Sequence, residues 1–196
     1  MRTMTLILLA SLAFGCNGSP KGRVKSGDEG DLVGARTAGA ETYNALIEEA
    51  TRKLLNAEAA RFPEGAVRKI AFVGIENRGA EELGDIREST NQIVETVIFQ
   101  AKRYDMIGQR YVDHGLKVTA MRAEDLFLHE GREKFVSILR EQGQDPDYLL
   151  WAVYTTLSTT GDQERQRDYL LTLELIDARS GRLMQKETAR VRKAYR

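Results

Sequence analysis

The chain has 196 residues, of which 42% are hydrophobic and 30% are charged. Its 29 Lys and Arg residues balance its 29 Asp and Glu residues, which excludes a global electrostatic attraction to nucleic acid. The single cysteine excludes an intramolecular disulfide. The roughly 157 residues from Ala40 onward suit one globular domain.

The stretch Met1–Cys16 predicts export and attachment to a membrane. Its apolar run is shorter than the roughly 20 residues that span a bilayer, and this length is typical of a secretory signal. The run ends at Gly15-Cys16 and resembles the signal of bacterial lipoproteins, in which the new N-terminal cysteine is lipidated. By this resemblance residues 1–15 are a signal peptide, Cys16 carries the lipid, and Asn17 in place of aspartate favours the outer membrane. The alternative is an incidental cysteine beside an ordinary cleaved signal.

Residues 16–39 combine the predicted lipidated cysteine with a polar segment that is rich in glycine. In this segment the only large apolar pair is Leu32-Val33, which is too little to form a core. We therefore expect a flexible linker whose r.m.s. span as a coil is roughly 25 to 30 Å. Such a linker would keep the globular part, residues 40–196, near its membrane.

The first half of the globular part predicts helices and strands in alternation. Apolar residues at spacings of three and four between Tyr43 and Leu55 indicate an amphipathic helix. The run Lys69–Ile75 is an almost unbroken apolar run and is too short for a buried helix, so it predicts a strand that is covered on both faces. In chain order we expect a helix from Ala40 to about Phe62-Pro63, the strand Lys69–Ile75, a polar loop over Glu76–Asp85, a helix with its N-cap at Ser89 or Thr90 that reaches Ala101, and a strand over Tyr104–Ile107.

The second half predicts two shorter helices followed by a β-rich region. The elements are helices Gln109–Lys117 and Arg132–Glu141 and strands Tyr148–Leu157, Arg167–Ile176 and Leu183–Lys193. The first of these strands is apolar on both alternating sets, which places it in the middle of a sheet with Trp151 in the core. The turn residues Asp177–Gly181 predict an antiparallel hairpin between the last two strands. The fold class is therefore α/β, a single domain with a mixed central sheet of about five strands, flanking helices and a C-terminal antiparallel meander.

The sequence contains few groups that indicate catalysis or metal binding. His114 and His129 are the only histidines and have no metal-ligand spacing, so we expect no zinc site. No P-loop, G-x-G-x-x-G, G-x-S-x-G or H-E-x-x-H pattern occurs, and paired carboxylates such as Glu124-Asp125 are typical of a solvated face. We therefore expect no catalytic residue and no cofactor. An unrecognised hydrolase is a weaker alternative, which predicts a deep polar pocket with clustered titratable groups.

Charge is distributed unevenly along the chain. Glu76–Glu95 is mainly acidic, whereas Arg182–Arg196 is mainly basic and includes a predicted edge strand. One interpretation is that both are solvent-exposed edges, and the other is that they dock a protein partner, since complementary charge sets encounter rate and register. The hairpin tip Gly161–Asp168 is a further candidate, because exposed loops on a rigid sheet commonly carry recognition. The candidate partner-binding residues are Arg165, Arg167, Lys186, Arg190 and Arg192.

The globular part resembles the LpoB family from about Lys69 to Tyr195. The resemblance rests on the strand Ile70–Asn77, the segments Thr90–Ile98 and Pro146–Leu149, and the run Tyr169–Gly181 with its closing Asp-x-x-Ser-Gly turn. Members of this family are outer-membrane lipoproteins that activate penicillin-binding proteins. The resemblance implies a fold like the N-terminal domain of TolB, no catalysis of its own, and binding to a peptidoglycan synthase.

Two functional hypotheses from different classes follow. The first is a monomeric, non-enzymatic regulator on the periplasmic side of the outer membrane, which binds and activates a penicillin-binding protein. The second is a structural subunit of an envelope assembly or secretion complex, by resemblance to lipoproteins that form outer-membrane secretion pores with a related domain. The first predicts stimulation of a synthase, and the second predicts ring-like oligomers.

Overall fold

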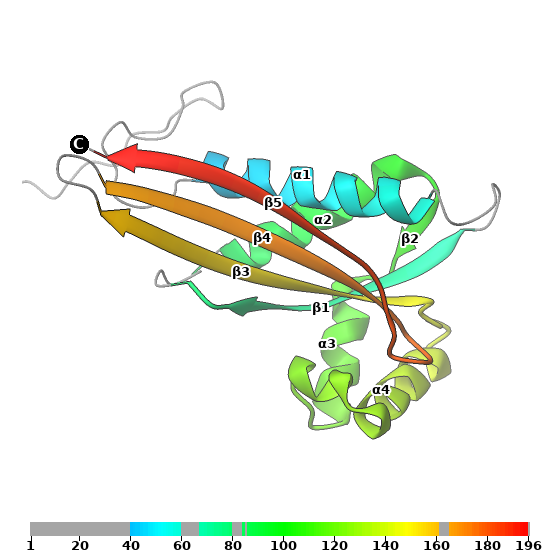
Figure 1. Ribbon diagram of the computed structural model, residues 1–196. Coiled ribbons are helices and arrows are strands. Elements are labelled where there is room, and N and C mark those ends of the chain that lie inside the picture. The colour runs from blue at the N-terminus through cyan, green and yellow to red at the C-terminus, as the bar shows by residue number, and fades with distance from the viewer. Residues whose placement is uncertain (1–39, 60–66, 80–83, 85, 161–164, 196) are drawn as a thin grey trace, which may run out of the picture. The chain divides into compact units, whose positions relative to one another are not determined.

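The computed structural model describes residues 40–59, 67–79, 84, 86–160 and 165–195, and all of them fall in one compact unit of the chain (Figure 1). Residues 1–39, with the predicted signal peptide, Cys16 and the linker, lie outside the described residues. The elements are α1 (Ala40–Ala59), β1 (Arg68–Asn77), α2 (Ile86–Ala101), β2 (Tyr104–Met106), α3 (Gln109–Val118), the 3₁₀ helix η1 (Ala123–Phe127), α4 (His129–Glu141), β3 (Tyr148–Thr160), β4 (Arg165–Asp177) and β5 (Leu183–Tyr195).

The described strands form one mixed sheet in the order β2-β1-β3-β4-β5. β1 pairs in parallel with both β2 and β3, whereas β3, β4 and β5 form an antiparallel meander. This arrangement confirms the predicted α/β fold with a mixed sheet and a C-terminal meander. β3 lies in the middle of the sheet and Trp151 is 2% exposed, which confirms its predicted place in the core.

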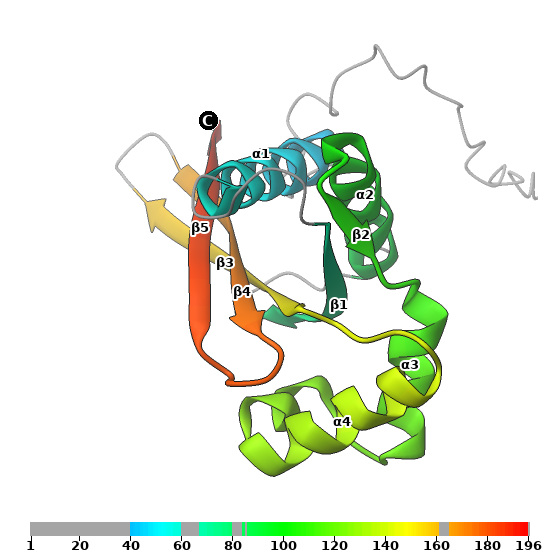
Figure 2. The same cartoon turned by 90° about the vertical axis from the view of Figure 1, so that its right-hand side faces the viewer.

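Helices pack on both faces of the sheet (Figure 2). On one face Leu46 and Leu54 of α1 and Val94 of α2 join apolar side chains of β1, β3 and β4. On the other face α3, η1 and α4 pack around Phe135 and Trp151. The alternation predicted for β4 is present, because Tyr169, Leu171, Leu173 and Leu175 all lie in the core under α1 and α2.

A buried carboxyl group ties the end of α1 to the sheet. Glu58 is 1% exposed and accepts hydrogen bonds from the hydroxyl of Tyr148, at 2.7 Å, and from the hydroxyl of Tyr104. The two tyrosines come from β3 and β2, so one side chain of α1 holds two strands. Burial, together with the hydrogen bond to Glu58, raises the pKa of both tyrosines above its ordinary value. Both carboxyl oxygens of this cluster therefore have partners inside the protein.

The turn between β4 and β5 confirms the predicted turn chemistry. Oδ1 of Asp177 accepts the backbone N–H of Ser180 at 2.7 Å and its hydroxyl at 2.8 Å. Burial alone raises the pKa of Asp177, but these hydrogen bonds outweigh it and hold the pKa below its ordinary value. Gly181 closes the turn with φ of 72°, a left-handed conformation that favours glycine.

The start of α2 differs from the sequence prediction. The helix begins at Ile86, so the predicted N-cap at Ser89 or Thr90 is wrong. Thr90 is buried inside the helix, where its hydroxyl donates to the carbonyl oxygen of Ile86 at 2.6 Å instead of accepting from a free amide. β1 continues to Asn77, so the polar loop that was expected from Glu76 begins two residues later.

Two further features of the helical region differ from the sequence prediction. α4 begins at His129, ahead of the predicted start at Arg132. The short helix η1 precedes it, and no periodic pattern predicts that helix. The predicted end of the first helix at Phe62-Pro63 lies outside the described residues.

Candidate protein-binding face

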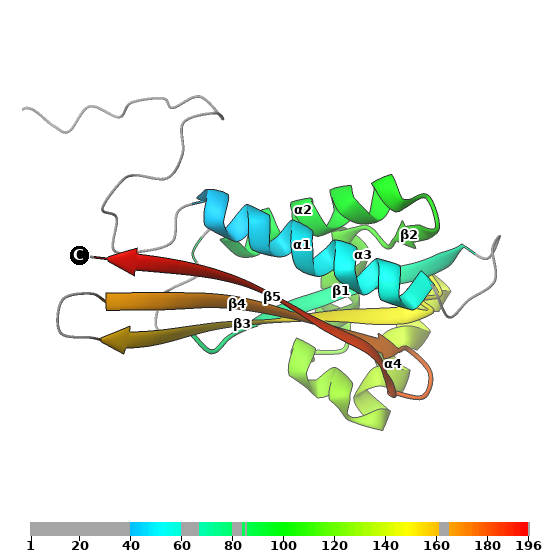
Figure 3. The same cartoon turned by 45° about the horizontal axis from the view of Figure 1, so that its top comes forward.

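Part of one sheet face extends beyond the helices that pack on it (Figures 1 and 3). α3, η1 and α4 pack around Trp151 and Ile176, whereas Leu157 towards the end of β3 is 54% exposed. The strand register places these positions in cross-strand rows, because side chains of equal parity share a face. The rows contain Leu157, Asp168 and Arg192; Thr155, Leu170 and Arg190; Thr172 and Thr188; and Glu174 and Lys186. We call these residues the open sheet face.

Asp168 lies at the centre of the charges on the open sheet face. Its carboxylate accepts hydrogen bonds from Arg192, at 3.0 Å, and from Arg190, and its side chain is 8% exposed. Burial alone raises the pKa of Asp168, but the hydrogen bonds from Arg192 and Arg190 outweigh it and hold the pKa below its ordinary value. Asp168 is therefore ionised at neutral pH, and it fixes the two guanidinium groups beside each other.

A second ion pair and a pair of hydroxyls continue the face toward the turn between β4 and β5. Nζ of Lys186 lies 2.7 Å from Oε1 of Glu174 on the neighbouring strand. Between the two ion-pair clusters, the hydroxyls of Thr172 and Thr188 are 2.9 Å apart. The face therefore presents paired charges, hydroxyls and aliphatic groups, and the positive charge of β5 is partly neutralised by β4. Such a mixed surface is typical of non-obligate protein interfaces.

The structure brings together three of the five predicted partner-binding residues. These are Lys186, Arg190 and Arg192, which share the open sheet face. Arg167 has the opposite parity on β4, and its Nε donates to Oγ of Ser158 on β3 at 3.3 Å. Arg165 is the first residue of β4. The predicted set therefore divides between a cluster on β5 and two arginines near the start of β4.

Sequence reasoning missed the acidic partners on β4. Asp168 and Glu174 are separated from their basic partners by the turn between β4 and β5, so their pairing depends on the register of the hairpin. A signal was present, because alternation back from Leu175 through Tyr169 puts Asp168 on the face opposite to the core that α1 and α2 cover. Extending that alternation by one residue predicts the carboxylate on the face of the basic side chains.

Metal-binding and membrane-spanning features are not found within the described ranges. No group of three or more His, Cys, Asp or Glu side chains there could hold a metal ion. His114 and His129 are exposed and belong to α3 and α4, respectively. Oδ2 of Asp125 accepts the backbone N–H of Arg122 at 2.8 Å, which gives this carboxylate a role at the start of η1. No helix in this part of the chain is long and apolar enough to cross a membrane.

Comparison with known proteins defines the class of fold. No family model matches the chain, and neither does any curated protein. The C-terminal domain of LpoB from Salmonella enterica has a TM-score of 0.50 at 13% identity, over 76% of this chain and 97% of that chain. The same values hold for the C-terminal domain of LpoB from Escherichia coli. The NMR structure of E. coli LpoB has a TM-score of 0.50 at 11% identity, over 92% of this chain and 86% of that chain. The described α/β unit therefore has an LpoB-like fold.

Proposed function

We propose that this chain is a non-enzymatic, lipid-anchored regulator that binds and activates a penicillin-binding protein. The observation that carries the proposal is the LpoB-like fold, which extends over 97% of the Salmonella LpoB domain. LpoB-family lipoproteins activate such synthases. Because one fold can host several functions, the signal-like stretch Met1–Cys16 provides a second, independent support. In the proposal Cys16 carries the lipid and holds the domain at the periplasmic side of the outer membrane.

The open sheet face is the proposed docking surface. Asp168 already orders the side chains of Arg190 and Arg192, so less conformational entropy is lost when a partner binds them. Leu157 is 54% exposed at the end of the same face, where it would gain most from burial against a partner. Charge on the face would mainly set the encounter rate and the orientation of the complex.

The direct test measures the activity of a synthase. The chain without residues 1–15 is added to a purified penicillin-binding protein from the same organism, and glycan polymerisation and crosslinking are measured. We expect both rates to rise with the amount of added protein and the chain alone to show no polymerising activity. An unchanged rate together with no detectable binding would contradict the proposal.

A matched set of variants tests the docking surface separately. Arg192→Ala and Lys186→Ala remove charges from the open sheet face, and we expect each to weaken binding up to about tenfold. Arg140→Ala is the control, because Arg140 lies on α4, has a side chain that is 55% exposed and forms a similar ion pair with Asp145 at 3.2 Å. If Arg140→Ala weakens binding as much, the partner does not bind specifically at the open sheet face.

The oligomeric state discriminates between regulation and assembly. Lys186, Arg190 and Arg192 lie on β5, the edge strand, and charged side chains on an edge oppose pairing between strands of different molecules. We therefore expect a monomer in size-exclusion chromatography with light scattering. A ring-like oligomer would instead support a structural subunit of an envelope assembly.

A further inference from the structure

One edge of β1 has no neighbouring strand over most of its length. β2 pairs only with Arg68–Ile70, whereas β1 continues to Asn77. Within the described residues, the segment from Ala71 to Asn77 therefore has β3 on one side and no strand on the other. Such an edge has alternating backbone N–H and C=O groups, which are a template for another extended chain. A bound chain would displace the guanidinium of Arg87 from the carbonyl oxygen of Ile75, to which it donates at 3.4 Å.

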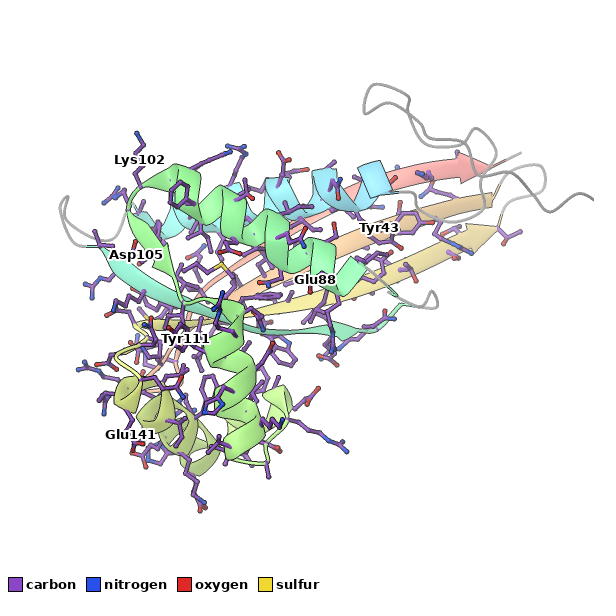
Figure 4. The ribbon with its side chains drawn as sticks, turned by 180° about the vertical axis from the view of Figure 1, so that it is seen from behind. Tyr43, Glu88, Lys102, Asp105, Tyr111 and Glu141 are labelled. Atoms are coloured by element: carbon purple, nitrogen blue, oxygen red, sulfur yellow. The ribbon has the colours of Figure 1, made fainter. Side chains whose placement is uncertain are left out.

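A cleft of about 550 Å³ lies along this edge, between α2 and α3 (Figure 4). Phe72–Ile75 of β1 line it along the strand, Glu88 and Asn91 line it from α2, and Gln109 lines it from α3. In Figure 4, α2 with Glu88 lies above β1, and α3 with Tyr111 lies below it. The volume is within the range of known binding sites in proteins.

Two side-chain amides on opposite sides of the cleft have oxygen atoms without a hydrogen-bond partner. Asn91 is 8% exposed, and its buried Oδ1 has no partner in the part of the chain that the structure describes. The same holds for Oε1 of Gln109, whose Nε2 donates to Asp113 at 2.9 Å. A buried amide oxygen without a partner is costly, and a ligand that donates a hydrogen bond would recover this free energy.

The charges and apolar groups around the cleft narrow the class of ligand. Arg87 and Arg122 face a similar number of acidic groups, so neither a polyanion nor a polycation is favoured. The acidic groups are Glu88, Asp113 and Glu124. Leu116, Met121 and Trp151 supply apolar surface in the same cleft. The lining therefore suits a ligand with uncharged side chains and many backbone-like polar groups.

We propose that this cleft binds an extended, uncharged peptide segment of a partner protein, which adds to β1 as a new edge strand. The peptide backbone bonds to the edge of β1 at Phe72–Ile75, the part of the strand that lines the cleft, as in other cases of strand addition. The amide oxygens of Asn91 and Gln109 are acceptors, which match the peptide N–H groups of the ligand. The proposal goes beyond regulation of a synthase, because it requires neither the open sheet face nor a synthase.

A pair of synthetic peptides tests strand addition. The probe is a blocked pentapeptide, acetyl-Thr-Val-Thr-Val-Thr-amide, and its partner carries N-methyl groups on alternate peptide nitrogens, so that it cannot bond as a strand. Binding to the full-length protein is followed by NMR and by amide hydrogen exchange. We expect the unmethylated peptide to slow exchange between Ala71 and Asn77 and to bind about tenfold more tightly than the methylated one. Equal affinities, or no binding of either peptide, would overturn the proposal.

Variants of the cleft test the role of the amides. Asn91→Leu keeps the size of the side chain but removes its polar atoms, and we expect the pentapeptide to bind about tenfold more weakly. Gln100→Leu is the matched control, since Gln100 is exposed on the same helix, and its affinity should equal that of the parent. Gln109→Leu provides a second test if Asn91→Leu fails to fold. Tighter binding of the N-acetylglucosamine trimer, which has amides but no peptide strand, would overturn the assignment to a peptide.

Discussion

Glu58 and Asn91 are both buried polar side chains on helices that pack on the same face of the sheet, and they differ in their partners. Glu58 is 1% exposed and accepts two tyrosine hydroxyls, whereas Asn91 is 8% exposed and has an oxygen without a partner among the described residues. Burial of a polar group is tolerated when its hydrogen bonds are made inside the protein. We infer that Glu58 stabilises the fold, and that Asn91 is retained at a cost to stability for binding.

The largest effect is expected from removal of the Glu58 carboxyl group. Glu58→Ala removes the buried carboxyl group that accepts the hydroxyls of Tyr104 and Tyr148, and the carbonyl oxygen of Leu55, 3.3 Å from the Tyr104 hydroxyl, replaces it only in part. We therefore expect the free energy of unfolding to fall by about 3 kcal/mol. Urea denaturation measures this change. Glu48→Ala is the control on the same helix, because Glu48 is 53% exposed and its ion pair with Arg52 should contribute less than about 0.5 kcal/mol. If Glu58→Ala lowers the free energy of unfolding no more than the control does, Glu58 does not stabilise the fold in the way that we infer.

The same cluster predicts a dependence of stability on alkaline pH. The pKa values of Tyr104 and Tyr148 are raised, first by burial and then by the hydrogen bond to Glu58. A group with a raised pKa in the folded state contributes stability that is fully present below the unfolded pKa of about 10 and is lost as pH rises through the folded value. We therefore expect the free energy of unfolding to decrease above that pH, and to decrease less in Tyr148→Phe. If the free energy of unfolding of the parent and of Tyr148→Phe depends on pH in the same way, the loss of stability does not come from Tyr148.

Strands could largely be predicted from the sequence, because alternation of apolar residues directly reports which face is buried. The run Tyr169–Leu175 shows this alternation, whereas the nearly continuous apolar run Lys69–Ile75 indicates a strand covered on both faces, and both form the expected strands. The start of α2 could not be predicted in this way. After Ile86 its first turn is polar, and Arg87 reaches the carbonyl oxygen of Ile75 on β1 at 3.4 Å, a tertiary contact that no local pattern reveals.

Of the two candidate sites, only the basic residues of the open sheet face could be predicted from the sequence, because their charge is visible there. The basic character of β5 is visible in the sequence, but the pairing of Arg190 and Arg192 with Asp168 depends on hairpin register. The cleft was not predictable, since Asn91 and Gln109 come from different helices and form no motif. Their lack of partners is a property of the folded chain, which only the structure shows.

A smaller effect on stability is expected from Asp168. Its carboxylate binds two exposed arginine side chains, whereas Glu58 joins a helix to two strands in the core. Asp168→Asn leaves Arg190 and Arg192 without their counter-charge, so we expect a lower melting temperature at neutral pH. Because the folded pKa of Asp168 is depressed, its contribution is present above the ordinary value of about 3.9 and is lost as pH falls through the folded value. The difference in melting temperature between the two proteins should therefore shrink in acid, and a difference independent of pH would contradict the ion-pair explanation.

The smallest effect on stability is expected at Asn91, so the changes in the free energy of unfolding of Asn91→Leu and Glu58→Ala can be compared directly. Asn91→Leu removes a buried amide oxygen that has no described partner and adds apolar surface beside the core, so the free energy of unfolding should stay the same or rise by up to about 0.5 kcal/mol. Urea denaturation of this variant beside Glu58→Ala and Gln100→Leu measures it. A loss of about 3 kcal/mol, as expected for Glu58→Ala, would mean that Asn91 is held by internal hydrogen bonds. Unchanged or raised stability combined with lost peptide binding is the pattern of a residue kept for a ligand, because substitutions that preserve or help folding and harm binding mark functional sites.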